Sequence, residues 1–447
     1  MFSSNDKISS RQIKRLLVFD IFGAGSLLLP SQLAMSENGI GIFSILAGTF
    51  FAGAYLWLLR ICASRTESDY LNYLKTGWGN ILARLCYLGY ALISIITCAW
   101  AAKILTQLVC DSLLDSVDFA AALFVIMLLA YYGASAGIEA RARVYEILFW
   151  VLVIPLLIML ALCVRQVQVI QWFPLLGEQD VISWSWFFIG TWRCFAAFLP
   201  LTFLLFLLPH VQDKRKSQRA AGWAVLLIGA ALLLVYLVLL GIFGSGALAK
   251  EQYPVITLMG MVKIPGEFLK RLDAVMVGGW FFTLYALIGS ALFYGVVIAR
   301  RALTGDDRHR QEAAGTYGQE TAGTYGRQEA GTYGRQEAGT YGRQETGTFR
   351  QQEAGAETAG SAGTKKTAGD TAGQPDNGQS AGGRAYWQGS NIWFLIAAAA
   401  SYGIAYAFHL WPQMQAQAVK VFYLGCVPFA VVVPVISLFL CSKRELE

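Results

Sequence analysis

Three charged residues lie inside long apolar stretches, and their side chains are the ones best placed to do chemistry. Asp20 lies in the first such stretch, Lys103 in the third and Arg193 near the middle of the sixth. A charge inside a bilayer is costly unless it is paired or hydrated, so it marks an ion pair or a functional site. Arg193 is too deep to reach water by snorkelling, so we expect it to face the bundle interior. There it could bind a ligand carboxylate or close a buried pair with Asp20.

More than one role is open for the other two charges. Asp20 could form a structural ion pair with Arg11 or Arg15, or it could be a carboxylate that responds to protons or cations. Lys103 lies nearer the outer end of its stretch, where its ammonium group could snorkel outward. Otherwise it is a second candidate for the proton site or ion pair.

Glycine and proline beside these charges predict interrupted helices. Gly23-Ala24-Gly25-Ser26 and then Pro30 follow Asp20, while Gly190-Thr191 precedes Arg193 and Pro200 follows it. In a bilayer, backbone leaves the helix only where it lines a cavity. Broken helices with polar groups at mid-depth are typical of transporter binding sites. With two polar residues from the eighth stretch, the predicted ligand-binding set is Gly23, Ala24, Gly25, Ser26, Gly190, Thr191, Arg193, Thr283 and Tyr285.

The composition is that of an all-α integral membrane protein. The chain has 447 residues, 56% hydrophobic and 14% charged, whereas soluble domains carry about a quarter charged residues. A membrane helix needs about 20 mostly apolar residues. Lysine and arginine recur at alternate ends of the spans, which predicts that both termini are cytoplasmic. The ten predicted spans are residues 14–34, 40–62, 85–110, 119–136, 143–164, 183–208, 221–243, 273–299, 391–409 and 416–441.

Two regions between the spans have a character of their own. Residues 253–262 are apolar but too short to span, which predicts a short helix across the outer vestibule. Residues 304–390 carry an octapeptide repeat, seen at Gly323, Gly331 and Gly339, followed by a Gly/Ala/Thr/Gln tract. This composition buries too little surface to offset ordering entropy, so we predict a disordered cytoplasmic loop, which is either a neutral insert or a tether or interaction tail. It divides the chain into helices one to eight (1–303), the loop (304–390), and helices nine and ten with a basic tail (391–447).

Several function classes are excluded by what the sequence lacks. It has no P-loop, no metalloprotease helix motif and no nucleophile elbow, and its three histidines lie at no believable catalytic centre. Its eight cysteines show no metal-ligand spacing. The net charge of +6 follows the membrane topology and does not indicate nucleic acid. We therefore expect no enzyme activity, cofactor, metal or nucleic-acid partner.

Interruptions in spans one and six of ten indicate two five-helix repeats. Inverted repeats of this kind place a ligand at mid-membrane between the two broken helices. The ends of the half-helices would then offer free backbone N–H groups to an anion such as an amino-acid carboxylate.

Several motifs resemble those of the endospore germination permeases, the B subunits of spore germinant receptors. The similarity covers nearly the whole chain except 304–390 and is carried by Ile8-Ser9-Ser10-Arg11-Gln12, Gly23 to Pro30, Leu208-Pro209-His210-Val211, Tyr253-Pro254-Val255-Ile256 and Ile264-Pro265-Gly266. It implies the LeuT-like fold of the amino acid–polyamine–organocation transporter superfamily. It also implies a protein of the spore inner membrane that senses a small-molecule germinant, often an amino acid, together with A-type and C-type receptor subunits.

Three functions therefore stand beside one another. The first is a germinant-sensing subunit, and the alternative is a proton-coupled amino-acid secondary transporter in which Asp20 carries the proton. A non-binding scaffold is the third, and the mid-depth charges argue against it. Sensor and transporter need the same pocket, so the sequence does not separate them.

Overall fold

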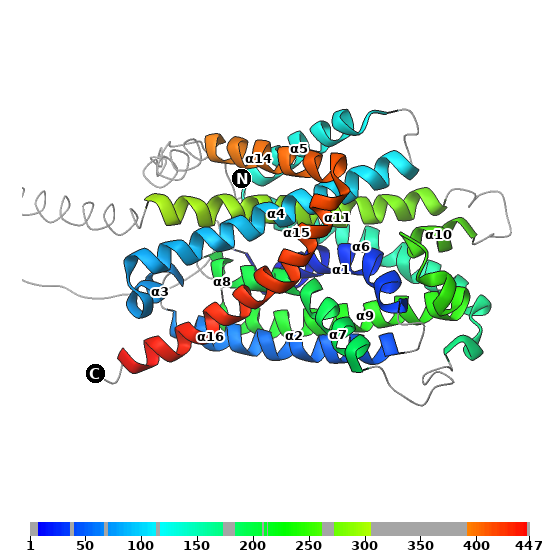
Figure 1. The fold of residues 1–447 in the computed structure, drawn as a ribbon, viewed down its shortest axis with the longest axis horizontal. Helices are drawn as coiled ribbons and strands as arrows, with labels where there is room; N and C mark the ends of the chain where they lie inside the picture. Colours follow the sequence, from blue (N-terminus) through cyan, green and yellow to red (C-terminus); the bar gives the residue numbers. More distant parts are fainter. Residues whose placement is uncertain are drawn as a thin grey trace, which may run out of the picture. The chain divides into compact units, whose positions relative to one another are not determined.

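A computed structural model describes residues 8–35, 40–66, 70–112, 117–172, 184–207, 210–211, 213–261, 272–304 and 391–444. The described helices belong to one unit, which joins residues 1–303 to residues 387–447 (Figure 1). The only extended pairing in these ranges is an isolated bridge between Ile8 and Val211. Apart from Thr304, the predicted loop 304–390 lies outside the described residues.

Each of the ten predicted spans coincides with a helix or a helix pair. Eight helices of the described chain are long and apolar enough to cross a membrane, and one bent pair adds a ninth span. The remaining predicted span is α5 (Phe119–Ser135), a shorter apolar helix. The eight comprise α1 (Ser10–Ala34), α2 (Ile40–Arg65), α4 (Asn80–Ser112), α6 (Ile138–Cys163), α9 (Lys214–Leu248), α11 (Leu272–Thr304), α14 (Asn391–Leu410) and the span made by α15 (Pro412–Val421), the π-helical turn Phe422–Cys426 and α16 (Val427–Arg444).

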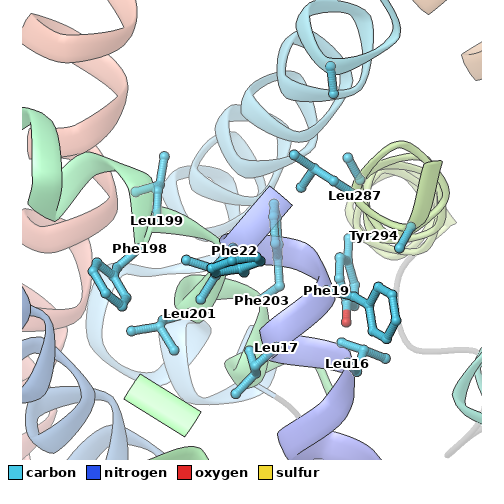
Figure 2. Close-up of a cluster of buried hydrophobic side chains, with 14 of the residues drawn as sticks. Leu16, Leu17, Phe19, Phe22, Phe198, Leu199, Leu201, Phe203, Leu287 and Tyr294 are labelled. Atoms are coloured by element: carbon cyan, nitrogen blue, oxygen red, sulfur yellow. The ribbon is translucent and has the colours of Figure 1, made fainter. Parts of the chain in front are cut away.

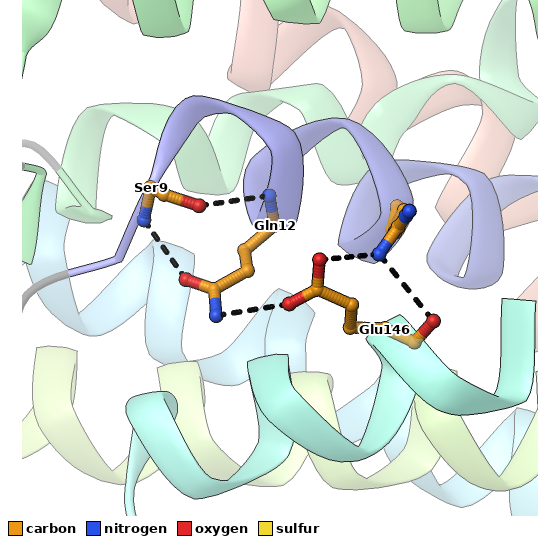
Figure 3. A network of polar contacts seen from close by, with 4 residues as sticks. Ser9, Gln12 and Glu146 are labelled. Atoms are coloured by element: carbon orange, nitrogen blue, oxygen red, sulfur yellow. Dashed lines mark hydrogen bonds and ion pairs between the residues drawn. The ribbon is translucent and has the colours of Figure 1, made fainter. Parts of the chain in front are cut away.

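The N-terminus of α1 is fixed by its first turn. Ser9 and Gln12 form a capping box, in which each side chain accepts a hydrogen bond from the other's backbone N–H (Figure 3). Gln12 also donates to Glu146 of α6, and Arg15 forms an ion pair with Glu146 at 2.5 Å. These contacts join the start of α1 to α6, and they give Arg15 a partner other than Asp20.

The predicted break in the first span is wrong, because α1 is helical from Ser10 to Ala34. Gly23 serves close packing instead: a Cβ built there would lie 2.2 Å from Oγ1 of Thr283 on α11. Ser26 donates to the Gly23 carbonyl oxygen at 3.2 Å. Pro30 lies inside the helix, which is tolerated in membrane helices where neighbouring groups satisfy the freed carbonyl.

The predicted break in the sixth span is confirmed. α7 (Trp184–Ala197) ends at Ala197, and after Phe198 the chain continues as the 3₁₀ turn η3 (Leu199–Phe203) and the short α8 (Leu204–Leu207), with a bend of 40°. Pro200 explains the break, since it has no N–H to donate and its ring clashes with the carbonyl of the preceding turn.

Three shorter elements complete the described chain. α10 (Pro254–Met261) confirms the predicted short helix after the seventh span, and it packs against α1 and α9. α3 (Tyr70–Trp78) was not predicted and packs against α4 and α16. Two 3₁₀ turns, η1 (Val164–Gln166) and η2 (Val169–Trp172), follow α6.

An aromatic core holds α1 against the broken helix and α11. Phe19 and Phe22 of α1 are buried beside Phe198 and Phe203 (Figure 2). Phe203 stacks on Tyr294 of α11, with ring centroids 4.6 Å apart. Because close-packed rings resist displacement, this core fixes the heights at which α1, η3 and α11 present their polar side chains.

Candidate functional site

A cavity of about 330 Å³ lies among α1, α4, the broken span α7–η3 and α15. Its walls are mostly apolar, with a few polar and charged groups, which is the usual make-up of a small-molecule site. Such sites range upward from about 300 Å³, so this one suits a small ligand. Its charged lining residues in the described chain are Asp20, Lys103 and Arg193.

Asp20 is buried and is linked to an arginine through a serine. Ser290 of α11 donates to Oδ1 of Asp20 at 2.6 Å. Arg141 of α6 donates through Nη2 to the Ser290 hydroxyl oxygen. Only 3% of Asp20 and 4% of Arg141 are exposed. The order of donors, from guanidinium to hydroxyl to carboxylate, suits an ionised pair.

Arg141 was not among the predicted site residues, because it lies with Arg143 near the basic end of a span, where positive charge is typical of the cytoplasmic side. Its guanidinium lies 5.7 Å from the ring centroids of Tyr145 and Phe293, whereas Arg143 is paired with Glu139. The spacing of residues along the helix does indicate that Arg141 is buried. Position 141 falls on the same buried face of α6 as Ile138, Ala142 and Tyr145.

Arg193 does not pair with Asp20, contrary to one of the predicted roles. Its Nη1 donates to the carbonyl oxygen of Gln32 at 3.0 Å. Gln32 lies in the last turn of α1, where carbonyls lack partners within the helix and a positive charge is favourable. Arg193 thus caps α1 while still lining the cavity.

Lys103 points into the protein and does not snorkel outward. Only 7% of it is exposed, and it lines the cavity. Its Nζ donates to Oε1 of Gln415 on α15 at 2.5 Å. Among the described residues, neither Lys103 nor Arg193 forms an ion pair.

Five of the predicted residues line the cavity, namely Asp20, Ala24, Gly25, Lys103 and Arg193. Six pack elsewhere, namely Gly23, Ser26, Gly190, Thr191, Thr283 and Tyr285. Ser26 accepts a hydrogen bond from Trp280, and Thr283 donates to the Trp280 carbonyl oxygen. Tyr285 donates to the Leu129 carbonyl oxygen, and Gly190 lies against Ser44. Ser26 and Tyr285 therefore join different helices, whereas the Thr283 bond stays within α11.

Several polar lining residues were not predicted. They are amides and aromatic side chains, including Gln32, Trp100, Gln107, Tyr253 and Gln415. Gln107 follows Lys103 by four residues, so helical spacing placed both on one face of α4. Trp100 precedes Lys103 by three residues and shares that face, whereas Tyr253 and Gln415 belong to segments whose approach to the cavity depends on the tertiary fold.

Comparison with known proteins identifies the family. The family described as "Spore germination protein" matches residues 7–310. Spore germination protein B2 of Bacillus subtilis (strain 168) is 24% identical over 292 residues, covering 63% of this chain and 75% of that protein. Spore germination protein A2 of the same bacterium is 21% identical over 289 residues, covering 63% and 78%.

The fold is also found among solved structures. A Na⁺-coupled sialic acid symporter in a substrate-bound outward-open state superposes with a TM-score of 0.59 at 11% identity, covering 96% of this chain and 79% of that one. At this identity the similarity concerns the fold alone. Together with the membrane-spanning helices, these findings show that the chain belongs to the spore germination protein family and is an integral multi-pass membrane protein with a LeuT-like transporter fold.

Proposed function

We propose that this chain is the germinant-sensing membrane subunit of a spore germinant receptor, and that it binds a small nutrient, an amino acid, in the cavity between α1, α4 and α7. The observation that carries the proposal is the cavity itself, whose volume and few inward charges suit a small polar molecule. Membership of the family supports the role in germination. Family and fold are those of membrane receptors and transporters, which supports the prediction that the chain is not an enzyme.

The proposed signal is a shift between two arrangements of the helices. A ligand shifts such an equilibrium only by its difference in affinity for the two states. The cavity is suited to this role because its wall includes Ala197 and Leu199, the residues on either side of the bend where α7 and η3 meet. The shift would pass to A-type and C-type subunits in the spore inner membrane, with both termini of this chain on the cytoplasmic side.

A valine at Gly25 tests the cavity as the nutrient site. Gly25 lines it, and a Cβ there would lie 3.4 Å from Leu232, an ordinary contact. The two further methyl groups of valine would enter the cavity or crowd Leu232. We expect Gly25→Val to abolish the nutrient-triggered fall in spore optical density at an unchanged protein level. Gly53→Val is the matched control, because a Cβ at Gly53 meets nothing within 4 Å. Unchanged germination of the Gly25 variant would refute the placement.

A proton-coupled amino-acid transporter is the alternative, favoured by the carboxylate of Asp20 in the cavity wall. The full-length protein in liposomes should then accumulate labelled amino acid when an inward proton gradient is imposed. A sensor would bind the same amino acid without accumulating it. Accumulation abolished by Asp20→Asn would favour the transporter.

A further inference from the structure

The charges that line the cavity do not balance. Asp20 is the only acid among its described lining residues, and it is already joined through Ser290 to the buried Arg141. Lys103 and Arg193 line the same cavity but donate to neutral oxygens, the side-chain oxygen of a glutamine and a backbone carbonyl. Two inward-facing cations of the described lining are thus without a counter-ion.

The two cations lie far from Asp20. Arg193 is bound at Gln32, which is twelve residues beyond Asp20 on the continuous helix α1. At about 1.5 Å per residue this is a rise of about 18 Å. The cavity is therefore longer than a small amino acid, and a ligand at the basic end does not reach Asp20.

Lys103 lies toward the same end. On α4, Ser94 donates to the carbonyl oxygen of Ala291, the neighbour of Ser290, and so marks the height of the Asp20 pair. Lys103 follows nine residues later, a rise of about 14 Å. α1 and α4 are the first and third spans and run in the same direction across the bilayer, because each span reverses the direction of the chain. Lys103 thus lies toward the Gln32 end of α1.

Unused hydrogen-bonding groups gather around these cations. A lysine ammonium has three donors and an arginine guanidinium has five, and each of these side chains makes one hydrogen bond in the described structure. Gln32 lines the cavity, and its buried Oε1 has no partner. Gln107 and Gln415 contribute further amides to the lining. A buried ammonium group at Lys103 and a partly buried guanidinium at Arg193, with only neutral partners, are unfavourable until an anion is supplied.

We propose that this basic end is an anion subsite, in which Lys103 donates hydrogen bonds to the carboxylate of a small nutrient and Arg193 adds a second positive charge at the same end of the cavity. The inference rests on the proposed function and names the chemical group, a carboxylate, that its ligand must carry. Amino acids and other small carboxylates carry this group, whereas sugars, nucleosides and amines without a carboxylate do not. In the ligand-bound state the carboxylate replaces the Gln415 side-chain oxygen as an acceptor for Lys103.

Binding to the purified full-length protein in nanodiscs tests the subsite. The probes are the common L-amino acids, the carboxamide and the decarboxylated amine of each, and the neutral nutrients glucose and inosine. We expect at least one amino acid to bind and its carboxamide to bind about 10- to 100-fold more weakly, as for loss of a hydrogen bond to a charged group. Lys103→Gln should weaken binding of that amino acid to a similar extent, and Lys103→Arg should restore much of it.

Gln415→Glu is the more specific test. In this variant Lys103 keeps a hydrogen-bond acceptor, so weaker ligand binding would not result from an unpaired buried charge. The substitution places a carboxylate of the protein beside Nζ of Lys103, so it should weaken amino-acid binding as Lys103→Gln does. If Gln415 only supports the fold, this variant should bind as the wild type does. Lys420→Gln is the matched control, since Lys420 is exposed on α15 and does not line the cavity.

The outcomes separate the subsite from the function on which it rests. Suppose that glucose, inosine or a carboxamide binds the wild-type protein and binds the Lys103→Gln protein with the same affinity. That result would overturn the anion subsite and leave nutrient sensing in place. Unchanged amino-acid binding in Gln415→Glu would overturn it as well. If no probe binds the wild-type protein, the cavity is not a nutrient site, and the proposed function fails together with the subsite.

Discussion

The buried pair at the Asp20 end of the cavity makes a quantitative prediction about stability. Arg141→Met would leave the Asp20 carboxylate with Ser290 alone, in a position where it is 3% exposed. Removing one partner of a buried pair costs about 3–5 kcal/mol, because the other charge stays buried without compensation. We expect Arg141→Met to lower the free energy of unfolding by this amount.

Removing the other partner of the pair, Asp20, should cost less stability. In Asp20→Asn the guanidinium of Arg141 keeps the faces of Tyr145 and Phe293, each 5.7 Å away. A desolvated cation–π contact is worth about 1–2 kcal/mol. Asp20→Asn should therefore lower the free energy of unfolding by about 1–2 kcal/mol less than Arg141→Met does. The double variant Asp20→Asn/Arg141→Met has no buried charge at this position and should be more stable than Arg141→Met alone.

Unfolding of the purified full-length protein by SDS in mixed micelles measures these differences as a double-mutant cycle. Arg143→Met is the control, since Arg143 is half-exposed and its helical pair with Glu139 should contribute about 0.3–0.5 kcal/mol. If the double variant loses the sum of the two single losses within about 0.5 kcal/mol, the two residues are not coupled. Equal losses for Arg141→Met and Arg143→Met would show that Arg141 is not buried in a pair.

Two further predictions concern packing and the long loop. Gly23→Ala should destabilise the protein by about 1–3 kcal/mol in the same assay, because the added Cβ would lie 2.2 Å from Oγ1 of Thr283. The second substitution Thr283→Gly should recover most of this lost stability. If Gly23→Ala left the stability unchanged, the close approach of the two helices would be contradicted. Deleting residues 304–390 should preserve both co-purification with partner subunits and nutrient-triggered germination, because the octapeptide tract cannot bury a core. If the deletion abolished the complex, the loop would not be a neutral insert.

The spans could be predicted from the sequence because a membrane imposes strong demands on length and apolarity. The break in the sixth span could be predicted for a similar reason, since Pro200 removes a hydrogen bond whatever surrounds it. The break at Gly23 could not be judged in the same way. Glycine permits both an interruption and a close helix contact, and only the position of Thr283 shows that the contact is the one used.

The three charged residues that line the cavity were predicted, but their hydrogen-bond partners were not. Asp20, Lys103 and Arg193 all line one cavity, as expected of charges inside apolar spans. Their partners depend on which faces of distant helices meet, which no local pattern specifies. Arg141 and Arg143 are equally basic and lie at one helix start, yet a difference of two residues buries one and exposes the other. Their positions on the faces of α6 predict which of the two is buried, whereas a count of basic residues does not.

The continuity of α1 changes what recognition in this cavity requires. An unbroken helix keeps its mid-span N–H groups within its own hydrogen bonds, so α1 offers none of them to a ligand anion. Lys103 and Arg193 are the basic side-chain donors in the described lining. The helices that carry them also hold the last span. Lys103 of α4 donates to Gln415, and Trp192, the neighbour of Arg193, donates to the carbonyl oxygen of Tyr423 in the π-helical turn at 3.1 Å. A carboxylate that draws Lys103 away from Gln415 thereby removes one of these two ties, so binding at the basic end is coupled to the position of α15.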